Sequence, residues 1–179
     1  LDLEESTELD FNTAQNITLG ARETKAFKFD ANAGEKIFYD ALNSNYTYKS
    51  VALLNANGHK IFTDDAEDDS GLITLKESGS YYLLFNGDSN STADINFRLI
   101  NTATNDGAID ISFEVQVTGS FGVQGYQTNF YRINAEKNDY LYFDDIPENS
   151  DSNYWTLYSP SGNTIVNNTL FDFEVELPS

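Results

Sequence analysis

The sequence is rich in oxygen ligands. Between residues 64 and 69, five of the six side chains are carboxylates. Carboxylates this close together repel one another unless water solvates them or a cation bridges them, and Ca²⁺ takes six to eight oxygen ligands. Their spacing does not fit the Asp-x-Asp-x-Asp-Gly calcium loop. A calcium site and a solvated acidic loop both stay open for this run, which consists of Asp64, Asp65, Glu67, Asp68 and Asp69.

Two further places could gather oxygen ligands for calcium. Asp106 and Asp110 flank Gly107 where two predicted domains meet, so a cation there would stiffen the junction. Asp151 lies between Asn149 and Asn153, an alternation that places oxygens on one side of a turn. For the alternation around Asp151, the alternative is ordinary turns in which Asn and Asp bond to their own backbone.

Little in the sequence supports catalysis. A zinc or copper site is not expected with one His and no Cys. His59 directly follows Asn57-Gly58, which predicts an exposed turn residue instead of a base. No Gly-x-Ser-x-Gly, His-Glu-x-x-His or P-loop pattern occurs. We therefore predict that the chain is not an enzyme, with a glycosidase-type carboxylate pair as the remaining catalytic alternative.

Aromatic residues offer a second kind of candidate site. Tyr46 and Tyr48 flank polar residues in a predicted loop, and Tyr154 and Trp155 lie near the equivalent place later in the chain. Exposed aromatic side chains bind sugars or extended peptides by stacking. These four residues are the candidate ligand-binding set, unless they belong to the core.

The net charge of the chain limits the kinds of molecule that it can bind. The 179 residues carry 29 acidic and 10 basic side chains, a net charge of −19. Such a chain is not expected to bind nucleic acid, whose affinity depends on Lys and Arg, or to dock on anionic lipid. No run reaches the ~18 apolar residues of a membrane span. We expect a secreted or cell-surface protein, processed or excised from a larger one, because the chain begins at Leu1 and contains no Met.

The elements that would position these residues are strands. Apolar and polar residues alternate over 109–118 and 171–177, as in strands with one face on a core. Turn signals such as Asn57-Gly58 and Asn105-Asp106-Gly107 separate them, and no helical periodicity is found. The pattern predicts an all-β antiparallel sandwich. Further strands are expected near 26–29, 37–42, 51–54, 80–85 and 95–100.

The chain repeats itself. Residues 27–42 lie over 131–146, and 54–58 over 158–162, since 131 − 27 and 158 − 54 both equal 104. Carried backwards, this offset sets Leu9 on Phe113 and Phe11 on Val115. Tandem duplication explains so long a register. We predict two domains, 1–104 and 105–179, with the second truncated or completed by another segment because about two strands are missing.

These residues resemble the bacterial pre-peptidase C-terminal domain family. The match lies in Phe27-x-Phe29 with Asn32-Ala33-Gly34, in the hairpin after Val51, in Gly79-Ser80-Tyr81-Tyr82-Leu83, and in Phe97 with Leu99. The resemblance implies a small jelly-roll-like sandwich that accompanies secreted enzymes or repeats in adhesins. Some relatives bind Ca²⁺ or extended protein.

Two departures limit what the resemblance implies. Many members of the family carry an acidic pair where this chain has Lys49-Ser50, and Asn138 replaces the turn glycine Gly34 in the second copy. We predict a non-catalytic spacer or adhesion module of a larger bacterial protein, whose partners are neighbouring domains of the same polypeptide. The alternative is a carbohydrate- or peptide-binding accessory domain of a secreted hydrolase.

Overall fold

The computed structural model describes residues 3–44, 49–87, 90–121, 127–144, 154–169 and 172–178. Within them the chain forms strands and turns, with one short 3₁₀ turn, η1 (Leu3–Glu5), and no α-helix. These residues contain no helix with the length and hydropathy that a membrane span requires. The predicted all-β sandwich is confirmed. The chain divides into two compact units, Leu1–Arg132 and Ile133–Ser179, and the boundary expected after residue 104 stays a prediction.

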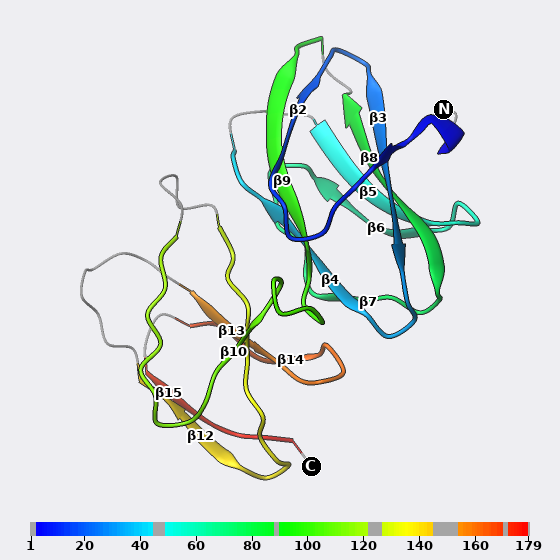
Figure 1. The fold of residues 1–179 in the computed structure, drawn as a ribbon. Helices are drawn as coiled ribbons and strands as arrows, with labels where there is room; N and C mark the ends of the chain where they lie inside the picture. Colours follow the sequence, from blue (N-terminus) through cyan, green and yellow to red (C-terminus); the bar gives the residue numbers. More distant parts are fainter. Residues whose placement is uncertain are drawn as a thin grey trace. The chain divides into compact units, whose positions relative to one another are not determined.

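The first unit is a sandwich of two antiparallel-rich sheets (Figure 1). One sheet has the order β1-β3-β8-β5-β6, and the other has the order β2-β9-β4-β7. The five strands expected near 26–29, 37–42, 51–54, 80–85 and 95–100 are all present as β3, β4, β5, β8 and β9. The nine strands are β1 (Thr7–Glu8), β2 (Gln15–Leu19), β3 (Thr24–Ala31), β4 (Lys36–Ala41), β5 (Lys49–Asn55), β6 (Lys60–Asp65), β7 (Ile73–Thr74), β8 (Gly79–Gly87) and β9 (Ala93–Asn101).

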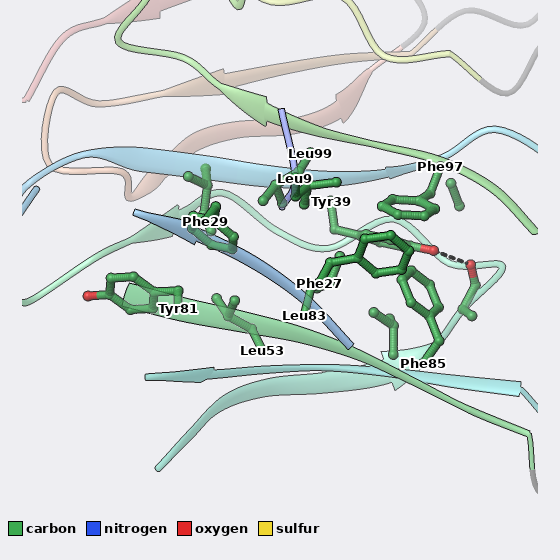
Figure 2. Close-up of a cluster of buried hydrophobic side chains, with 14 of the residues drawn as sticks. Leu9, Phe27, Phe29, Tyr39, Leu53, Tyr81, Leu83, Phe85, Phe97 and Leu99 are labelled. Carbon is green, nitrogen blue, oxygen red and sulfur yellow. Dashed lines mark hydrogen bonds between the residues drawn. The ribbon is translucent and has the colours of Figure 1, made fainter. Parts of the chain in front are cut away.

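Alternation explains which faces pack together. On β9 the residues Ile95, Phe97 and Leu99 all point inward and are fully buried, because successive side chains of a strand point to opposite faces. Phe27 and Phe29 of β3 do the same from the facing sheet. Figure 2 shows these side chains meeting between the two sheets. Residues two apart on each strand therefore form the packed interior of the sandwich.

Aromatic rings fill the centre of this core. Phe97 lies 4.6 Å from Phe85 and 5.5 Å from Phe27 between ring centroids, and Tyr39 stacks on it at 5.9 Å. Offset and edge-on pairs of this kind add about 0.5–1.5 kcal/mol each beyond the area they bury. The Tyr39 hydroxyl donates to the Ala66 carbonyl at 2.7 Å, so its polar end is satisfied inside the core.

The outer face of the β4–β9 pair is also covered. Phe38 and Ile100 point away from the core yet are buried. Phe130 lies against Phe38, with ring centroids 5.1 Å apart. The segment 127–130 therefore packs on this face of the first sandwich, and β4 is buried on both sides.

The expected strand over 109–118 was wrong for most of its length. β10 (Ile109–Asp110) pairs in parallel with β11 (Tyr131–Arg132), and a turn then follows at residues 113–114. Phe113 is 52% exposed, and Val115 and Val117 are exposed too. Alternation fixes which side chains share a face, but a strand also needs a neighbour whose backbone groups it can pair.

The second unit holds two short antiparallel ladders. β12 (Tyr140–Phe143) pairs with β15 (Phe173–Glu176), and β13 (Trp155–Tyr158) pairs with β14 (Thr164–Thr169). The strand expected over 171–177 is thus confirmed for its described part. Phe143 stacks on Phe173 at 4.4 Å and lies 6.4 Å from Trp155, so side chains from both ladders meet.

Candidate functional sites

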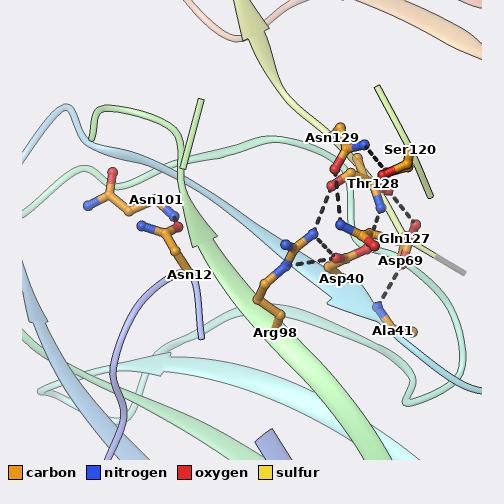
Figure 3. Close-up of polar contacts among 10 residues, drawn as sticks. All are labelled: Asn12, Asp40, Ala41, Asp69, Arg98, Asn101, Ser120, Gln127, Thr128 and Asn129. Carbon is orange, nitrogen blue, oxygen red and sulfur yellow. Dashed lines mark hydrogen bonds and ion pairs between the residues drawn. The ribbon is translucent and has the colours of Figure 1, made fainter. Parts of the chain in front are cut away.

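A polar cluster holds the segment 127–130 on the sandwich. Asp40 of β4 is completely buried. Its Oδ2 accepts from the Arg98 guanidinium, with Nη2 at 2.5 Å and Nε at 3.0 Å. The Thr128 backbone N–H donates to the other Asp40 oxygen at 3.1 Å, and the Thr128 carbonyl accepts from Arg98 at 2.8 Å. Figure 3 shows this group, which we call the clasp together with Asp69.

The structure separates Asp69 from the rest of its acidic run. Its Oδ1 accepts from the Ala41 N–H at 2.7 Å, and its Oδ2 accepts from the Thr128 hydroxyl at 3.2 Å. Although Asp69 as a residue is exposed, desolvation of its carboxyl group raises its pKa to about 6, and the nearby charges of Asp40 and Asp68 add to the effect. Desolvation also raises the pKa of Asp40, against the lowering effect of Arg98.

A second arginine fixes the turn after β9. Arg132 binds Asp110 through Nε at 2.9 Å and Nη2 at 3.2 Å. It also donates to Asn105 Oδ1 at 2.8 Å and to the carbonyls of Ala103 and Ala108. We call this group the Arg132 anchor. With the Thr102 carbonyl, six acceptor atoms surround this guanidinium and hold residues 103–110 in one conformation, since its planar donors have fixed directions.

The predicted calcium ligands do not gather into one place in the described chain. Asp64 and Asp65 lie exposed in β6, and Glu67 and Asp68 follow in the turn after it. Asp106 is exposed, and Asp110 is paired with Arg132. Over the described ranges no three His, Cys, Asp or Glu side chains are grouped as a metal site would need. Asp151 lies outside the described residues. Calcium binding stays a prediction.

Of the four aromatic candidates, two can be placed. Tyr46 and Tyr48 lie outside the described residues. Tyr154 is 59% exposed and Trp155 at the start of β13 is 38% exposed, so both present aromatic surface to solvent. The binding role of this pair stays a prediction.

Sequence reasoning missed two more exposed aromatic residues. Tyr140 and Tyr142 point outward from β12. Their hydroxyls donate to Glu176 at 2.8 Å and to Asp172 at 3.0 Å, and these hydrogen bonds raise the pKa of both phenols. The signal in the sequence was the alternation Tyr140-Leu141-Tyr142-Phe143, which places both Tyr on the face opposite the buried Leu141.

Two other features bear on function. His59 lies exposed in the turn between β5 and β6, as expected for a turn residue. A hollow beside the clasp, lined by Arg98, Ile109 and Phe130 among others, has a volume of about 60 Å³. That is room for water molecules, since a small-molecule pocket takes roughly 300 Å³ or more.

Comparisons with known proteins find only distant similarity. No family model and no curated protein matches the chain. PliG of Aeromonas hydrophila, a periplasmic inhibitor of g-type lysozyme, is 12% identical over 52% of this chain and 91% of its own, with a TM-score of 0.43. The pre-peptidase C-terminal domain of a Bacillus anthracis collagenase is 17% identical over 53% and 94%, with a TM-score of 0.46. PliG of Salmonella Typhimurium is 15% identical over 52% and 97%, with a TM-score of 0.36. At this level of similarity, function has to be inferred from the chain's own geometry.

Proposed function

We propose that the chain is a non-catalytic spacer or adhesion module of a larger bacterial secreted or cell-surface protein. The observation that carries the proposal is the attachment of residues 103–110 and 127–132 to the first sandwich. Thr128 is held by the clasp and Phe130 by Phe38. Arg132 donates to the carbonyls of Thr102 and Ala103, directly after β9. A chain that leaves a domain at fixed points keeps its direction, which is what a module that projects its neighbours requires.

Matching hydrogen bonds support a tandem duplication, as in a repeated spacer. In the first unit Gly34 N–H donates to the Leu75 carbonyl at 2.8 Å, with Gly34 at φ 90°. In the second unit Asn138 N–H donates to the Leu177 carbonyl at 3.1 Å, with Asn138 at φ 64°. Asn tolerates this left-handed conformation better than most residues. The turn before β12 thus has the bonding of the turn before β4.

The second hairpin repeats as well. Gly58 N–H donates to the Asn55 carbonyl, and Gly162 N–H donates to the Ser159 carbonyl, each at 2.9 Å. Both glycines have positive φ, 75° and 90°. Leu157 pairs with Val166 as Leu53 pairs with Phe62. These pairs keep the offset of 104.

The N-terminal strand also has a counterpart, at a different offset. Leu9 N–H donates to the Lys28 carbonyl at 2.7 Å, and Ile111 N–H donates to the Arg132 carbonyl at 2.8 Å. Asn12 and Glu114 both have positive φ, 62° and 60°. Leu9 therefore corresponds to Ile111, not to Phe113 as the uniform offset predicted. The offset is 102 here.

The spacer proposal can be tested by the stiffness of the chain. We would attach a donor and an acceptor dye at the two ends and record the distribution of single-molecule energy transfer. A rigid spacer gives one narrow distribution, and Asp40→Asn, which weakens the clasp, broadens it. Thr18→Val is the matched control, because it removes an exposed side-chain bond to Asp94 far along the same sheet. A broad distribution in the unaltered chain would contradict the proposal.

A second candidate function has its own observation. Tyr154 and Trp155 present adjacent exposed aromatic side chains, which fits a carbohydrate- or peptide-binding accessory domain of a secreted hydrolase. Trp155 is the only Trp, so its fluorescence reports directly on this surface. A saturable shift of its emission during titration with a glycan or an extended peptide supports binding. An unchanged spectrum across the panel favours the pure spacer.

A further inference from the structure

The exposed aromatic surface of the second unit occupies positions that are core in the first. Leu157 pairs with Val166 as Leu53 pairs with Phe62. Trp155 lies two residues before Leu157 on β13 and so stands at the position of Val51, although a register shift pairs Trp155 with Thr169. Val51 is fully buried, whereas Trp155 is 38% exposed. A large aromatic residue at an interior position is thus left in contact with solvent.

Side chains of β12, in the facing ladder, are also less buried than their equivalents in β4. Leu141 and Phe143 stand at the positions of Ile37 and Tyr39, since the turn bonds before β12 and β4 match. Ile37 and Tyr39 are completely buried. Leu141 is buried, but Phe143 is only half-buried although it contacts Phe173 and Trp155. The inward side chains of the described second unit thus contact one another but stay partly open to solvent.

The first unit shows what covers these positions. β8 lies beside β5, with Phe85 paired to Val51 and Leu83 paired to Leu53. β9 lies beside β4, with Leu99 paired to Tyr39 and Phe97 to Ala41. The inward side chains of β8 and β9 named here are completely buried. One hairpin therefore supplies the central strand of both sheets.

The described residues of the second unit contain no counterpart of that hairpin. β12 has β15 as its sheet neighbour, and β13 has β14. In the first unit the equivalents of these pairs, β4–β7 and β5–β6, form the edges of sheets whose centres are β9 and β8. The described residues of the second unit thus form the two edge pairs of a sandwich without its central strands.

We propose that the second unit binds a two-stranded β-hairpin of the β8–β9 kind, which completes both of its sheets. One strand of this hairpin pairs with β13 and the other with β12, in the registers of β8 on β5 and β9 on β4. The added strands gain backbone hydrogen bonds along both ladders, and their inward side chains cover Trp155 and Phe143. The proposal rests on the matching bonds of the two units and goes beyond the spacer role.

The site also specifies its occupant. Trp155 is much larger than Val51, so the residue opposite it should be smaller than Phe85, its equivalent in the first unit. Residues 133–179 carry nine acidic side chains and one Lys. Outward positions of the hairpin should therefore be neutral or basic, because further acidic residues would add to the repulsion. The occupant is a polypeptide with alternating apolar residues, not a glycan.

The test supplies the hairpin covalently to the full chain. If Leu177 is matched to Leu75 through their turn bonds, a copy of residues 78–101 attached after Ser179 continues in register. In this copy the residue equivalent to Phe85 is changed to Ala to make room for Trp155. The matched control carries the same graft with the residues equivalent to Leu83, Phe97 and Leu99 changed to Ser.

Acrylamide quenching of Trp155 gives the readout. We expect the quenching constant to fall about threefold or more and the emission to move to shorter wavelength in the grafted chain but not in its control. Protection of the β12 and β13 amides from hydrogen exchange should rise in parallel. The proposal is overturned if Trp155 stays equally accessible in a grafted chain whose first unit is folded by circular dichroism.

One further outcome would also overturn it. The unaltered chain could shield Trp155 by self-association, seen as concentration-dependent emission together with a dimer in sedimentation, and the occupant would then be a second copy. The stiffness measured by energy transfer on the unaltered chain does not depend on the graft. A failure of the hairpin proposal is therefore distinguishable from a failure of the spacer proposal.

Discussion

Replacing Arg98 by Leu should destabilise the first unit strongly and in a pH-dependent way. Among the described residues, the variant leaves the completely buried Asp40 carboxylate with Thr128 as its remaining donor. Breaking a buried ion pair by removing one partner costs about 3–5 kcal/mol, because the other charge stays buried without compensation. We therefore expect the free energy of unfolding at pH 7 to fall by about 3–5 kcal/mol.

The sign of the pH dependence follows from Asp40. Burial already raises its pKa above the ordinary value, and Arg98 is the main group that lowers it. Without Arg98 the folded-state pKa rises further, so the folded variant holds the Asp40 proton more tightly than the unfolded chain does. Stability then increases as pH falls through the folded-state pKa. The deficit of Arg98→Leu relative to the unaltered chain should shrink as the pH is lowered from 7 toward the ordinary Asp pKa of 3.8.

Urea unfolding followed by far-ultraviolet circular dichroism measures this deficit. Trp155 fluorescence serves as an internal control, because the only Trp belongs to the second unit. The loss of unfolding free energy in the double variant Asp40→Asn with Arg98→Leu should be smaller than the sum of the two single-variant losses by about 0.5–3 kcal/mol, as for residues in direct contact. A loss below about 1 kcal/mol for Arg98→Leu, or one that stays the same as the pH is lowered, would refute the reasoning.

Four other outcomes can be measured on the same chain. The folded-state pKa of Asp69, about 6, lies above the ordinary Asp pKa of 3.8, so its contribution makes the free energy of unfolding decrease as pH rises between these values; this pH slope should be reduced in Asp69→Asn, and an unchanged slope counts against the assignment. Gly107→Ala should cost more than about 2 kcal/mol in urea unfolding, because its Cβ would meet the Asn101 carbonyl, whereas Gly71→Ala, with open space around it, should stay within about 0.5 kcal/mol. Phe97→Ala should cost about 3–5 kcal/mol, but Phe113→Ala, which is 52% exposed, less than about 0.5 kcal/mol; equal losses would contradict the exposure of residues 113–117. If calcium binds, Ca²⁺ at ~100 times its Kd should add about 2.7 kcal/mol and raise Tm, and identical Tm values in Ca²⁺ and excess chelator would exclude it.

The sandwich of the first unit could be predicted because its information is local. Each strand from β3 to β9 that was expected has apolar residues two apart, and turn residues separate it from the next strand. The sequence of β4 also indicates that both of its faces are buried. Ile37-Phe38-Tyr39 is an unbroken apolar run, and such runs are typical of strands buried on both sides. The sequence did not say which segment covers that outer face.

The clasp could not be predicted, because its members are far apart in the sequence. Asp40 and Arg98 are 58 residues apart, and Thr128 lies 30 residues after Arg98. Any of the 29 acidic residues could have been the partner of Arg98. Only the pairing of β4 with β9, where Asp40 lies opposite Arg98, selects this one. Long-range polar contacts depend on sheet register, which alternation alone leaves undetermined.

The two offsets between the repeats show which changes a duplicated sandwich tolerates. Matching bonds give 104 for the hairpins and 102 both for the N-terminal strand and for the pair Leu75 and Leu177, so the copies differ by two residues on either side of the hairpins. A shift of one residue would move every apolar side chain of the strand to the opposite face. A shift of two keeps each on its original face, as the parallel pairing of β10 with β11 repeats that of β1 with β3. β10 and β11 belong to the first unit. In the second unit the hairpin offset of 104 keeps Trp155 at the interior position of Val51, where no described strand covers it. An interior position without a covering strand is what a site for added strands requires.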